Sequence, residues 1–323
     1  MYGWGSSTNN WKKPGYKYDD ARKPYLDKLA ADSSASGPRN YMISRAPNLG
    51  EVNPLGKSIT SNSQNPIIIA VDVTGSMAQA PGEFFDRAPL IWQTLSQYRP
   101  DMEICFAAIG DANGDQWPLQ VIDFTKEIAL EQRIKALGCE GGGGGTLSES
   151  YELFGYFMLN HCTAPNATTP YLFIYGDEKF YNQVHPGQVE GIIGDELQGP
   201  LDSMGLWKGL IQKFNVFFIQ KPYGNGNHPE IDAKVHELWA NALGDQRIIQ
   251  SLGMERAADQ IMGIIAKQWG QYGDFMANIS SRQDKEVVEQ VDNSLKFIDG
   301  KPSGDSVRPK VDANTPKTKP LVG

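Results

Sequence analysis

The sequence predicts an α/β protein built on a mostly parallel β-sheet. Residues 66–72 read Pro-Ile-Ile-Ile-Ala-Val-Asp, a short unbroken apolar run typical of a central strand that is buried on both faces. Similar runs recur at 103–109, 171–175 and 215–220. Stretches with helical spacing separate them, and strands that alternate with helices of about 12 residues form βαβ units with a parallel sheet.

The remaining elements continue this alternation. Helical spacing predicts helices over residues 81–98, 125–137, 147–159, 201–214, 229–243, 254–269 and 286–297. Two further short strands are predicted at 117–124 and 247–250. Pro118 has no backbone N–H to donate, which favours the edge of the sheet for the first of them.

The composition is that of a globular protein. The 323 residues are 40% hydrophobic and 21% charged, enough to form a core that is stable unaided. No apolar run approaches the roughly 20 residues needed to cross a bilayer, and the first residues lack the regions of a signal peptide. We therefore expect a cytoplasmic protein without a membrane partner. Three widely spaced cysteines indicate neither a disulfide framework nor a zinc pattern.

The net charge of −8 is unevenly distributed along the chain. Residues 1–62 carry nine basic and five acidic side chains, and residues 300–323 carry five and two. The residues between them therefore hold a net charge of −15. An acidic body with basic arms argues against nucleic acid as a partner of the body. The arms are expected to fold back on the body or to contact a partner.

Four segments follow from these patterns. Residues 1–62 form an irregular arm rich in Gly, Ser, Asn and Pro, whose many Tyr and Trp rings predict docking on its own domain or on another chain. Residues 63–272 form the α/β domain, residues 273–299 a helical extension, and residues 300–323 a flexible tail.

Oxygen-bearing side chains occur in three segments near the predicted strand ends. The first segment directly follows the strand at 66–72, the second ends a run of five glycines that leads into a helix, and the third follows the strand at 171–175. Ligands of an open parallel sheet bind beyond the carboxyl ends of its strands. The side chains expected to meet there are Asp72, Thr74, Ser76, Thr146 and Asp177.

These side chains have the chemistry of a site for a hard divalent cation. Two carboxylates and three hydroxyls, without His or Cys, suit Mg²⁺, Mn²⁺ or Ca²⁺ better than zinc. Five ligands leave one position of an octahedral ion open. An Asp or Glu from a partner protein can then complete its coordination.

The spacing resembles the metal-ion-dependent adhesion site (MIDAS) of von Willebrand factor A (vWA) domains. Asp72-Val-Thr-Gly-Ser76 is similar to the Asp-x-Ser/Thr-x-Ser core of that site, Thr146 to its third hydroxyl ligand, and Asp177 to its last carboxylate. The resemblance implies a vWA domain over residues 63–272, with a doubly wound, Rossmann-like sheet of six strands, one antiparallel edge strand and helices on both faces. In the family, some of these ligands, commonly the carboxylates, act through water.

The resemblance also implies a function. A divalent cation at the site, Mg²⁺ or else Mn²⁺ or Ca²⁺, would bind an acidic residue of a partner protein, and the chain would act as an adaptor and not as an enzyme. Intracellular prokaryotic vWA proteins of this size often work with MoxR-type AAA+ ATPases, or in defence and stress systems. The sequence departs from the family in its long glycine loop, its long segment 176–200, and its N-terminal arm.

Two alternative functions remain open at this stage. The aromatic arm could exchange onto a neighbouring subunit and build a homo-oligomer or filament. An RNA-associated role like that of Ro-type proteins, which also carry a vWA domain, is the second alternative. The acidic body and the absence of a helical-repeat pattern argue against it.

Other motifs for chemistry are incomplete. Residues 111–115 begin like an EF-hand loop, but Gln116 and Ile122 occupy the positions that need Gly and Glu. Asp111 could instead contact the metal ligands and orient them without binding the ion itself. The glycine run lacks the Gly-Lys-Ser/Thr of a phosphate-binding loop. Thr74 stands where a haloacid dehalogenase-type phosphatase needs a second Asp. We therefore expect no catalytic residues.

Overall fold

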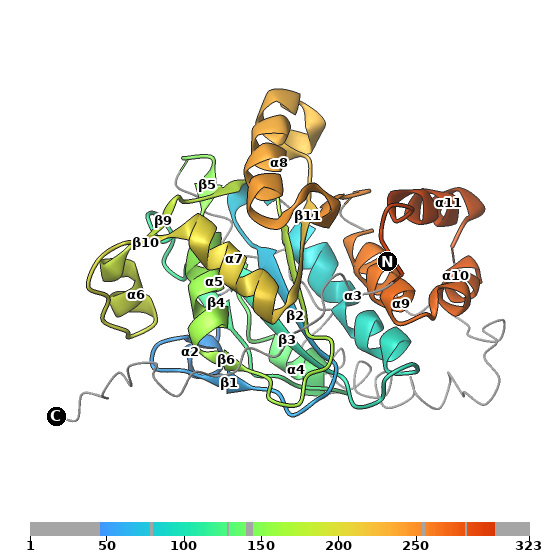
Figure 1. Cartoon of the computed structure of the whole chain (residues 1–323), viewed down its shortest axis with the longest axis horizontal. Coiled ribbons are helices and arrows are strands. Elements are labelled where there is room, and N and C mark those ends of the chain that lie inside the picture. The colour runs from blue at the N-terminus through green and yellow to red at the C-terminus, as the bar shows by residue number, and fades with distance from the viewer. Residues whose placement is uncertain are drawn as a thin grey trace.

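A six-stranded β-sheet forms the centre of the protein (Figure 1). The computed structural model describes residues 46–77, 80–127, 129–139, 145–253, 256–281 and 283–300. The strands are β2 (Pro66–Asp72), β3 (Glu103–Ile109), β4 (Leu119–Val121), β7 (Tyr171–Gly176), β11 (Asn215–Gln220) and β12 (Ile248–Gln250). Their order across the sheet is β12-β11-β7-β2-β3-β4, and every neighbouring pair is parallel except β3 with β4. The predicted α/β class with a mostly parallel sheet is confirmed.

Strand β2 shows why the sheet needs continuous apolar runs. All seven of its residues are buried. Successive side chains of a strand point to opposite faces, so Ile67, Ile69 and Val71 enter one hydrophobic core while Ile68 and Ala70 enter the other. A strand that alternated between apolar and polar residues would leave one of these cores unfilled.

Helices supply the other half of each core. The first core contains side chains of α3 (Ala80–Leu95), α4 (Ala129–Ile134) and α9 (Ala257–Gln268). The second contains side chains of α5 (Tyr151–Asn160), α7 (Ser203–Lys213) and α8 (Pro229–Leu243). Figure 1 shows α5 beside α7, and α9 beside α3. The ring of Phe218 stacks on Trp239 with centroids 4.2 Å apart, which holds α8 against β11.

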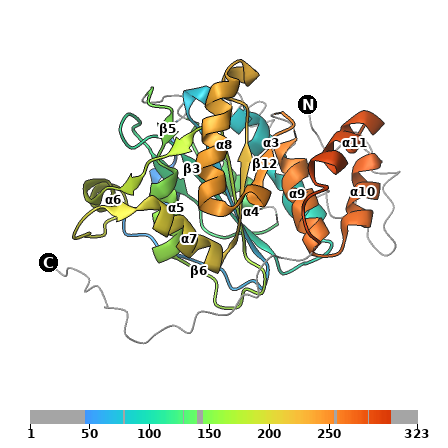
Figure 2. The same ribbon diagram turned by 45° about the horizontal axis from the view of Figure 1, so that its top comes forward.

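The C-terminal extension consists of two helices, α10 (Tyr272–Ser280) and α11 (Lys285–Ser294), where the sequence predicted one. Both pack beside α9 at one side of the molecule (Figure 2). Phe275, Ile279 and Val291 are fully buried and extend the first core. The extension therefore folds as part of the same body.

Residues 46–62, which the sequence analysis counted with the arm, also pack on the body. They contain α2 (Leu49–Val52) and β1 (Ile59–Thr60), and β1 pairs in parallel with β6 (Cys162–Thr163). Val52 and Ile59 are buried. The rest of the predicted arm, residues 1–45, and residues 301–323 of the predicted tail lie outside the described residues.

Several short elements do not follow from hydrophobic periodicity. The predicted helices at 147–159 and 201–214 each begin with a two-residue strand, β5 (Ser148–Glu149) and β10 (Leu201–Asp202). The long segment 176–200 contains β8 (Lys179–Phe180), β9 (Gln183–Val184) and α6 (Pro186–Ile192). Strand β5 pairs with β8, and β10 pairs with β9. Such short pairings depend on tertiary contacts, so a local pattern cannot reveal them.

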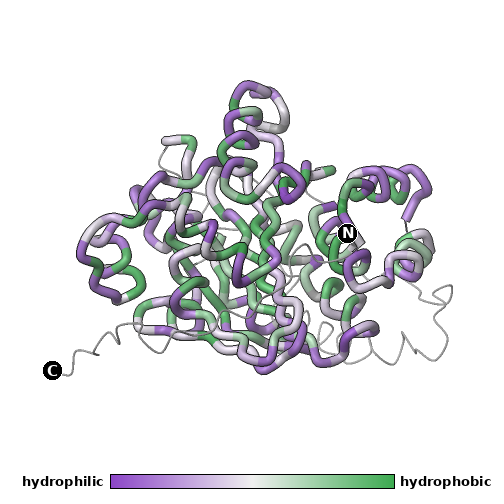
Figure 3. The backbone as a smooth tube through the Cα atoms, in the orientation of Figure 1, coloured by the Kyte–Doolittle hydropathy of each residue, from purple (hydrophilic) through white to green (hydrophobic). Residues whose placement is uncertain are grey.

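Apolar residues are concentrated in the central strands and in the inner faces of the helices, as the green stretches of Figure 3 show. Along the described ranges, none of the helices combines the length and the hydropathy that a membrane crossing requires.

Phe173 provides a test of the first core. Its ring is buried on β7 and stacks on Phe217 with centroids 5.4 Å apart. Phe173→Ala is expected to lower the free energy of unfolding by about 3–5 kcal/mol, because it removes buried apolar surface and leaves a cavity. Urea denaturation measures the loss. Phe297→Ala, at a side chain that is half exposed, is the control and should change stability by no more than about 0.5 kcal/mol. Equal effects of the two substitutions would contradict this description of the core.

Candidate functional site

Four of the five predicted site residues lie together at the carboxyl edge of the sheet. Asp72 is the last residue of β2, and Asp177 follows β7, the neighbouring parallel strand. The Ser76 hydroxyl donates a hydrogen bond to Asp177 Oδ1 at 2.8 Å, which joins the two strand ends. The fourth residue, Thr74, lies between Asp72 and Ser76 and contacts both.

The turn after β2 is organised around the Asp72 carboxylate. Thr74 donates to Asp72 Oδ1 through its backbone N–H at 2.9 Å and through its hydroxyl at 2.6 Å. A short-chain acid that accepts from the backbone two residues further on stabilises a tight turn. The Ser76 hydroxyl lies 3.3 Å from the Thr74 hydroxyl, within the 3-10 turn η1 (Gly75–Met77). The alternating positions of Asp72, Thr74 and Ser76 in the sequence therefore bring their three oxygen-bearing side chains together on one turn.

Tyr151 fixes the other Asp72 oxygen. Its hydroxyl donates to Asp72 Oδ2 at 2.5 Å from the first turn of α5. Gly176 makes this approach possible, since a Cβ at that position would overlap the Tyr151 hydroxyl. The carboxylate that ends β2 is thus held by groups from the adjacent turn and from a helix far away in the sequence.

Asp177 is paired with a buried lysine. Lys221 follows β11 and donates from Nζ to Asp177 Oδ2 at 2.9 Å and to the Ser76 carbonyl at 3.0 Å. Both side chains of the ion pair are almost completely buried. The pKa of Asp177 is raised overall, because the effect of burial exceeds the opposing effect of the Lys221 ammonium.

Thr146 lies at the same edge but in a different hydrogen-bond group. Its hydroxyl contacts the Tyr181 hydroxyl at 2.8 Å, and Tyr181 donates to both Asp111 carboxylate oxygens at 3.1 Å. Within the described part of the chain, Thr146 does not hydrogen bond directly to the residues of the 72–76 turn or to Asp177. Residues 140–144 of the glycine loop lie outside the described residues.

Additional buried acids crowd this edge. Burial and the neighbouring Asp177 raise the pKa of Asp72 to about 7. Burial and the charge on Asp72 raise the pKa of Glu178 to about 8 and that of Glu149 to about 10. Each of these shifts records an unfavourable interaction of the ionised carboxylate with its surroundings.

Four further residues at this edge, Glu149, Glu178, Tyr151 and Lys221, were not predicted from the sequence. Glu178 was detectable, because it adjoins Asp177 in the sequence. Glu149, Tyr151 and Lys221 carry no spacing signal, since tertiary packing alone brings them to the site.

The donor set fits a hard divalent cation. Oxygen atoms of two carboxylates and two hydroxyls converge in one hydrogen-bonded group, and two further buried acids, Glu149 and Glu178, lie beside it. The Glu149 Oε2 atom is buried and has no hydrogen-bond partner within the described ranges. Those ranges contain no group of three or more His, Cys, Asp or Glu side chains placed to hold a metal ion. The predicted ligand set includes only two side chains of these types, Asp72 and Asp177.

Comparison of the chain with protein-family models and with curated protein sequences gives no match. Among solved structures, the pilus adhesin SpaC from Lactobacillus rhamnosus GG, in its open conformation, aligns with a TM-score of 0.46 and 11% identity, over 67% of this chain and 31% of the adhesin. Proximal thread matrix protein 1 from the mussel byssus aligns with a TM-score of 0.44 and 9% identity, over 67% of this chain and 49% of that protein.

This chain therefore spans about a third of the adhesin and about half of the matrix protein. At these TM-scores and identities, the similarity identifies neither a family nor a function.

The buried acids predict a definite dependence of stability on pH. Burial raises the pKa of Glu152 from 4.5 to about 8, so the folded protein retains a proton that the unfolded chain has released. The folded state therefore binds more protons between about pH 5 and pH 8, and the free energy of unfolding should fall as the pH rises through that range. Urea denaturation in the presence of a chelator measures this slope.

Two variants test the assignment of this slope to the buried acids. Glu152→Gln keeps an oxygen that can accept from the Tyr181 N–H and should flatten the profile. The exposed Glu190→Gln should leave the slope of the unmodified protein unchanged. A free energy of unfolding that increased from pH 5 to pH 8 would contradict the prediction.

Proposed function

We propose that the protein binds a divalent cation through Asp72, Thr74, Ser76 and Asp177, and that the cation binds an acidic side chain of a partner protein. The observation that carries the proposal is the Ser76 to Asp177 hydrogen bond, which unites the ends of β2 and β7. When bound, the ion would supply a concentrated positive charge and a coordination position for the partner's carboxylate.

The sheet topology supports this location. Numbered along the chain, the strands of the sheet follow the order 3-2-1-4-5-6, and the order reverses between β2 and β7. In open α/β sheets, ligands bind at this switch point, outside the carboxyl ends of the strands. Asp72 ends one of the two strands that flank it, and Asp177 directly follows the other.

We further propose that the sheet is doubly wound in the manner of vWA domains. Helix α3 connects β2 to β3 and packs in the first core. Helices α7 and α8 precede β11 and β12 and pack in the second core. The resemblance of the 72–76 turn to the vWA metal site then extends from the motif to the sheet that presents it.

Each residue has a defined part in the proposed site. Asp72 and Asp177 supply negative charge, while Thr74 and Ser76 supply neutral oxygen donors. Tyr151 orients Asp72 through its hydroxyl. Thr146 is included in the proposed ligand set because its position in the sequence resembles that of the third hydroxyl ligand of vWA domains. To bind the ion, its hydroxyl would have to give up its contact with Tyr181.

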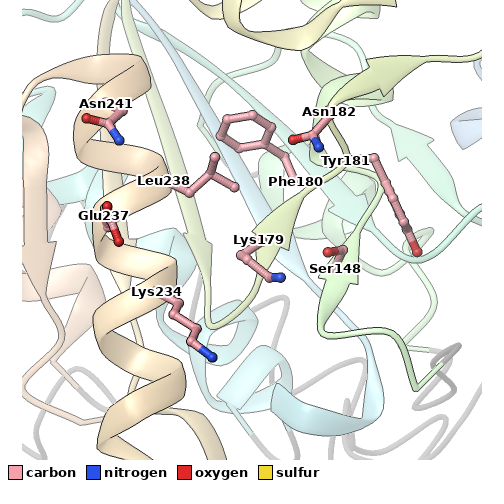
Figure 4. Close-up of a pocket in the computed structure, with 9 residues that line it drawn as sticks. All are labelled: Ser148, Lys179, Phe180, Tyr181, Asn182, Lys234, Glu237, Leu238 and Asn241. Atoms are coloured by element: carbon pink, nitrogen blue, oxygen red, sulfur yellow. The ribbon is translucent and has the colours of Figure 1, made fainter.

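The surface beside the site suits an acidic partner. A pocket of about 420 Å³ lies between β8 and α8, and Lys179 and Lys234 contribute to its walls (Figure 4). Tyr181, which contacts Thr146, lines the same pocket, so the pocket adjoins Thr146 of the proposed ligand set. Glu237 is the acidic residue of the lining. Two lysines attract a negatively charged segment more strongly than one glutamate repels it.

We propose from the vWA resemblance that the protein acts in the cytoplasm as an adaptor, and that a MoxR-type AAA+ ATPase is a candidate partner. The proposed activity is binding, so equilibrium measurements test it.

Asp72→Ala should abolish the binding of Mn²⁺ and Mg²⁺, because it removes a charged ligand. The measurements are titration calorimetry and the shift in melting temperature, with acetate present to stand in for the partner's carboxylate. A ligand that binds only the folded state at 100 times its Kd stabilises it by about 2.7 kcal/mol, so the shift in the unmodified protein should be easy to detect.

Asp245→Ala is the matched control for Asp72→Ala. The Asp245 carboxyl is exposed and pairs with His236 on the surface, so its removal should leave cation binding intact. The proposal is wrong if the unmodified protein binds neither ion with acetate present, or if Asp72→Ala binds both ions as the unmodified protein does.

A further inference from the structure

Lys221 places a fixed positive charge against the proposed cation site. Its side chain is 5% exposed. The ammonium has three hydrogen-bond donors, and three acceptors surround it: Asp177 Oδ2 at 2.9 Å, the Ser76 carbonyl at 3.0 Å and the Pro222 carbonyl at 3.3 Å. Moving the side chain away would leave the buried Asp177 carboxylate without its positively charged donor, so the charge is held in position.

In the proposed site, the Lys221 ammonium would share Asp177 with the bound cation. Lys221 contacts Asp177 Oδ2, while the Ser76 hydroxyl contacts Asp177 Oδ1. Both carboxylate oxygens are therefore engaged before any ion arrives. An incoming cation competes with Ser76 and Lys221 for the negative charge of Asp177, and it enters a region that already holds one positive charge.

The surrounding charges explain why a lysine is present. Asp72, Asp177, Glu149 and Glu178 are all buried at this edge. Of the ion pairs formed by described residues, the one between Lys221 and Asp177 is the pair that involves these acids. Without Lys221, the metal-free site would confine this group of buried acids with no positive charge in contact with Asp177.

We propose that Lys221 is a built-in counter-cation that stabilises the metal-free site and lowers its affinity for a divalent ion. This inference rests on the proposed function. It also specifies how the site is regulated: because Lys221 weakens the hold of the protein on the ion, firm retention requires the additional negative charge of the partner's carboxylate. Ion and partner then bind cooperatively, each increasing the affinity for the other.

Lys221→Met tests the inference by two effects of opposite sign. The variant should bind Mn²⁺ at least about tenfold more tightly than the unmodified protein, because a like charge beside the ion is removed. Its melting temperature in chelator should be lower, because the buried acids lose their counter-charge. A residue with a merely structural role would lower the melting temperature without tightening ion binding.

Lys213→Met is the matched control. Lys213 is a partly buried lysine, and it donates to the backbone carbonyls of Met158, Leu159 and Cys162. It precedes β11, whereas Lys221 follows it, so the two lysines lie at opposite ends of that strand. Lys213→Met should lower the melting temperature and leave the Kd for Mn²⁺ unchanged.

Acetate tests the coupling. Adding acetate should tighten Mn²⁺ binding to the unmodified protein by a larger factor than it tightens binding to Lys221→Met. Lys221→Arg keeps the positive charge and should bind Mn²⁺ about as the unmodified protein does. If Lys221→Met does not fold, Lys221→Gln, which removes the charge but retains a hydrogen-bond donor, is measured in its place with the same expectation.

The results distinguish a failure of the counter-cation role of Lys221 from a failure of the proposed cation binding. If the unmodified protein binds Mn²⁺ and loses it on Asp72→Ala, while the folded Lys221 variant binds with equal or lower affinity, the counter-cation role is wrong and the metal site stands. If the unmodified protein does not bind Mn²⁺ even with acetate, the proposed function fails and the inference fails with it.

Discussion

The repulsion between buried carboxylates is the constraint around which this edge of the protein is organised. Asp72 ends β2 and Asp177 directly follows the neighbouring parallel strand β7, so the topology itself brings two acids into one buried region. Serine, threonine and tyrosine hydroxyls donate to them, and a lysine supplies a counter-charge. The raised pKa of Asp72, about 7, shows that these contacts do not fully offset the burial of charge. A region with this residual demand for positive charge is suited to attract a cation.

The fold and the site have opposite effects on the stability of the domain. The central strands supply the stability of the domain through two cores, and the acids at their ends weaken it. Natural proteins commonly accept such local losses of stability at binding sites, because the arrangement that suits the ligand is seldom the most stable one for the free protein. The distribution found here, a strongly apolar sheet that ends in a poorly neutralised rim, follows this compromise.

Much of the architecture could be predicted from the sequence, because parallel strands and their helices have strong periodic signals. The apolar run of β2 and the acid that ends it were recognisable, and so were the turn at 72–76 and Asp177. Tyr151 and Lys221 were not recognisable, since α5 and the end of β11 reach the site only through packing. The paired strands of two residues were not predicted either, because they are too short to show a period. The hydrogen bond of Thr146 to Tyr181 depends on a side chain 35 residues away.

Gly176 links the size of one residue to the identity of another. Any side chain at that position would collide with the Tyr151 hydroxyl, which anchors Asp72. During evolution the two positions are therefore not free to drift separately: a lineage that acquires a methyl group at 176 must give up the phenol at 151 or shift the helix that bears it. Glycine at 176 together with tyrosine at 151 would then mark those descendants in which the acid at the end of the central strand keeps its orientation.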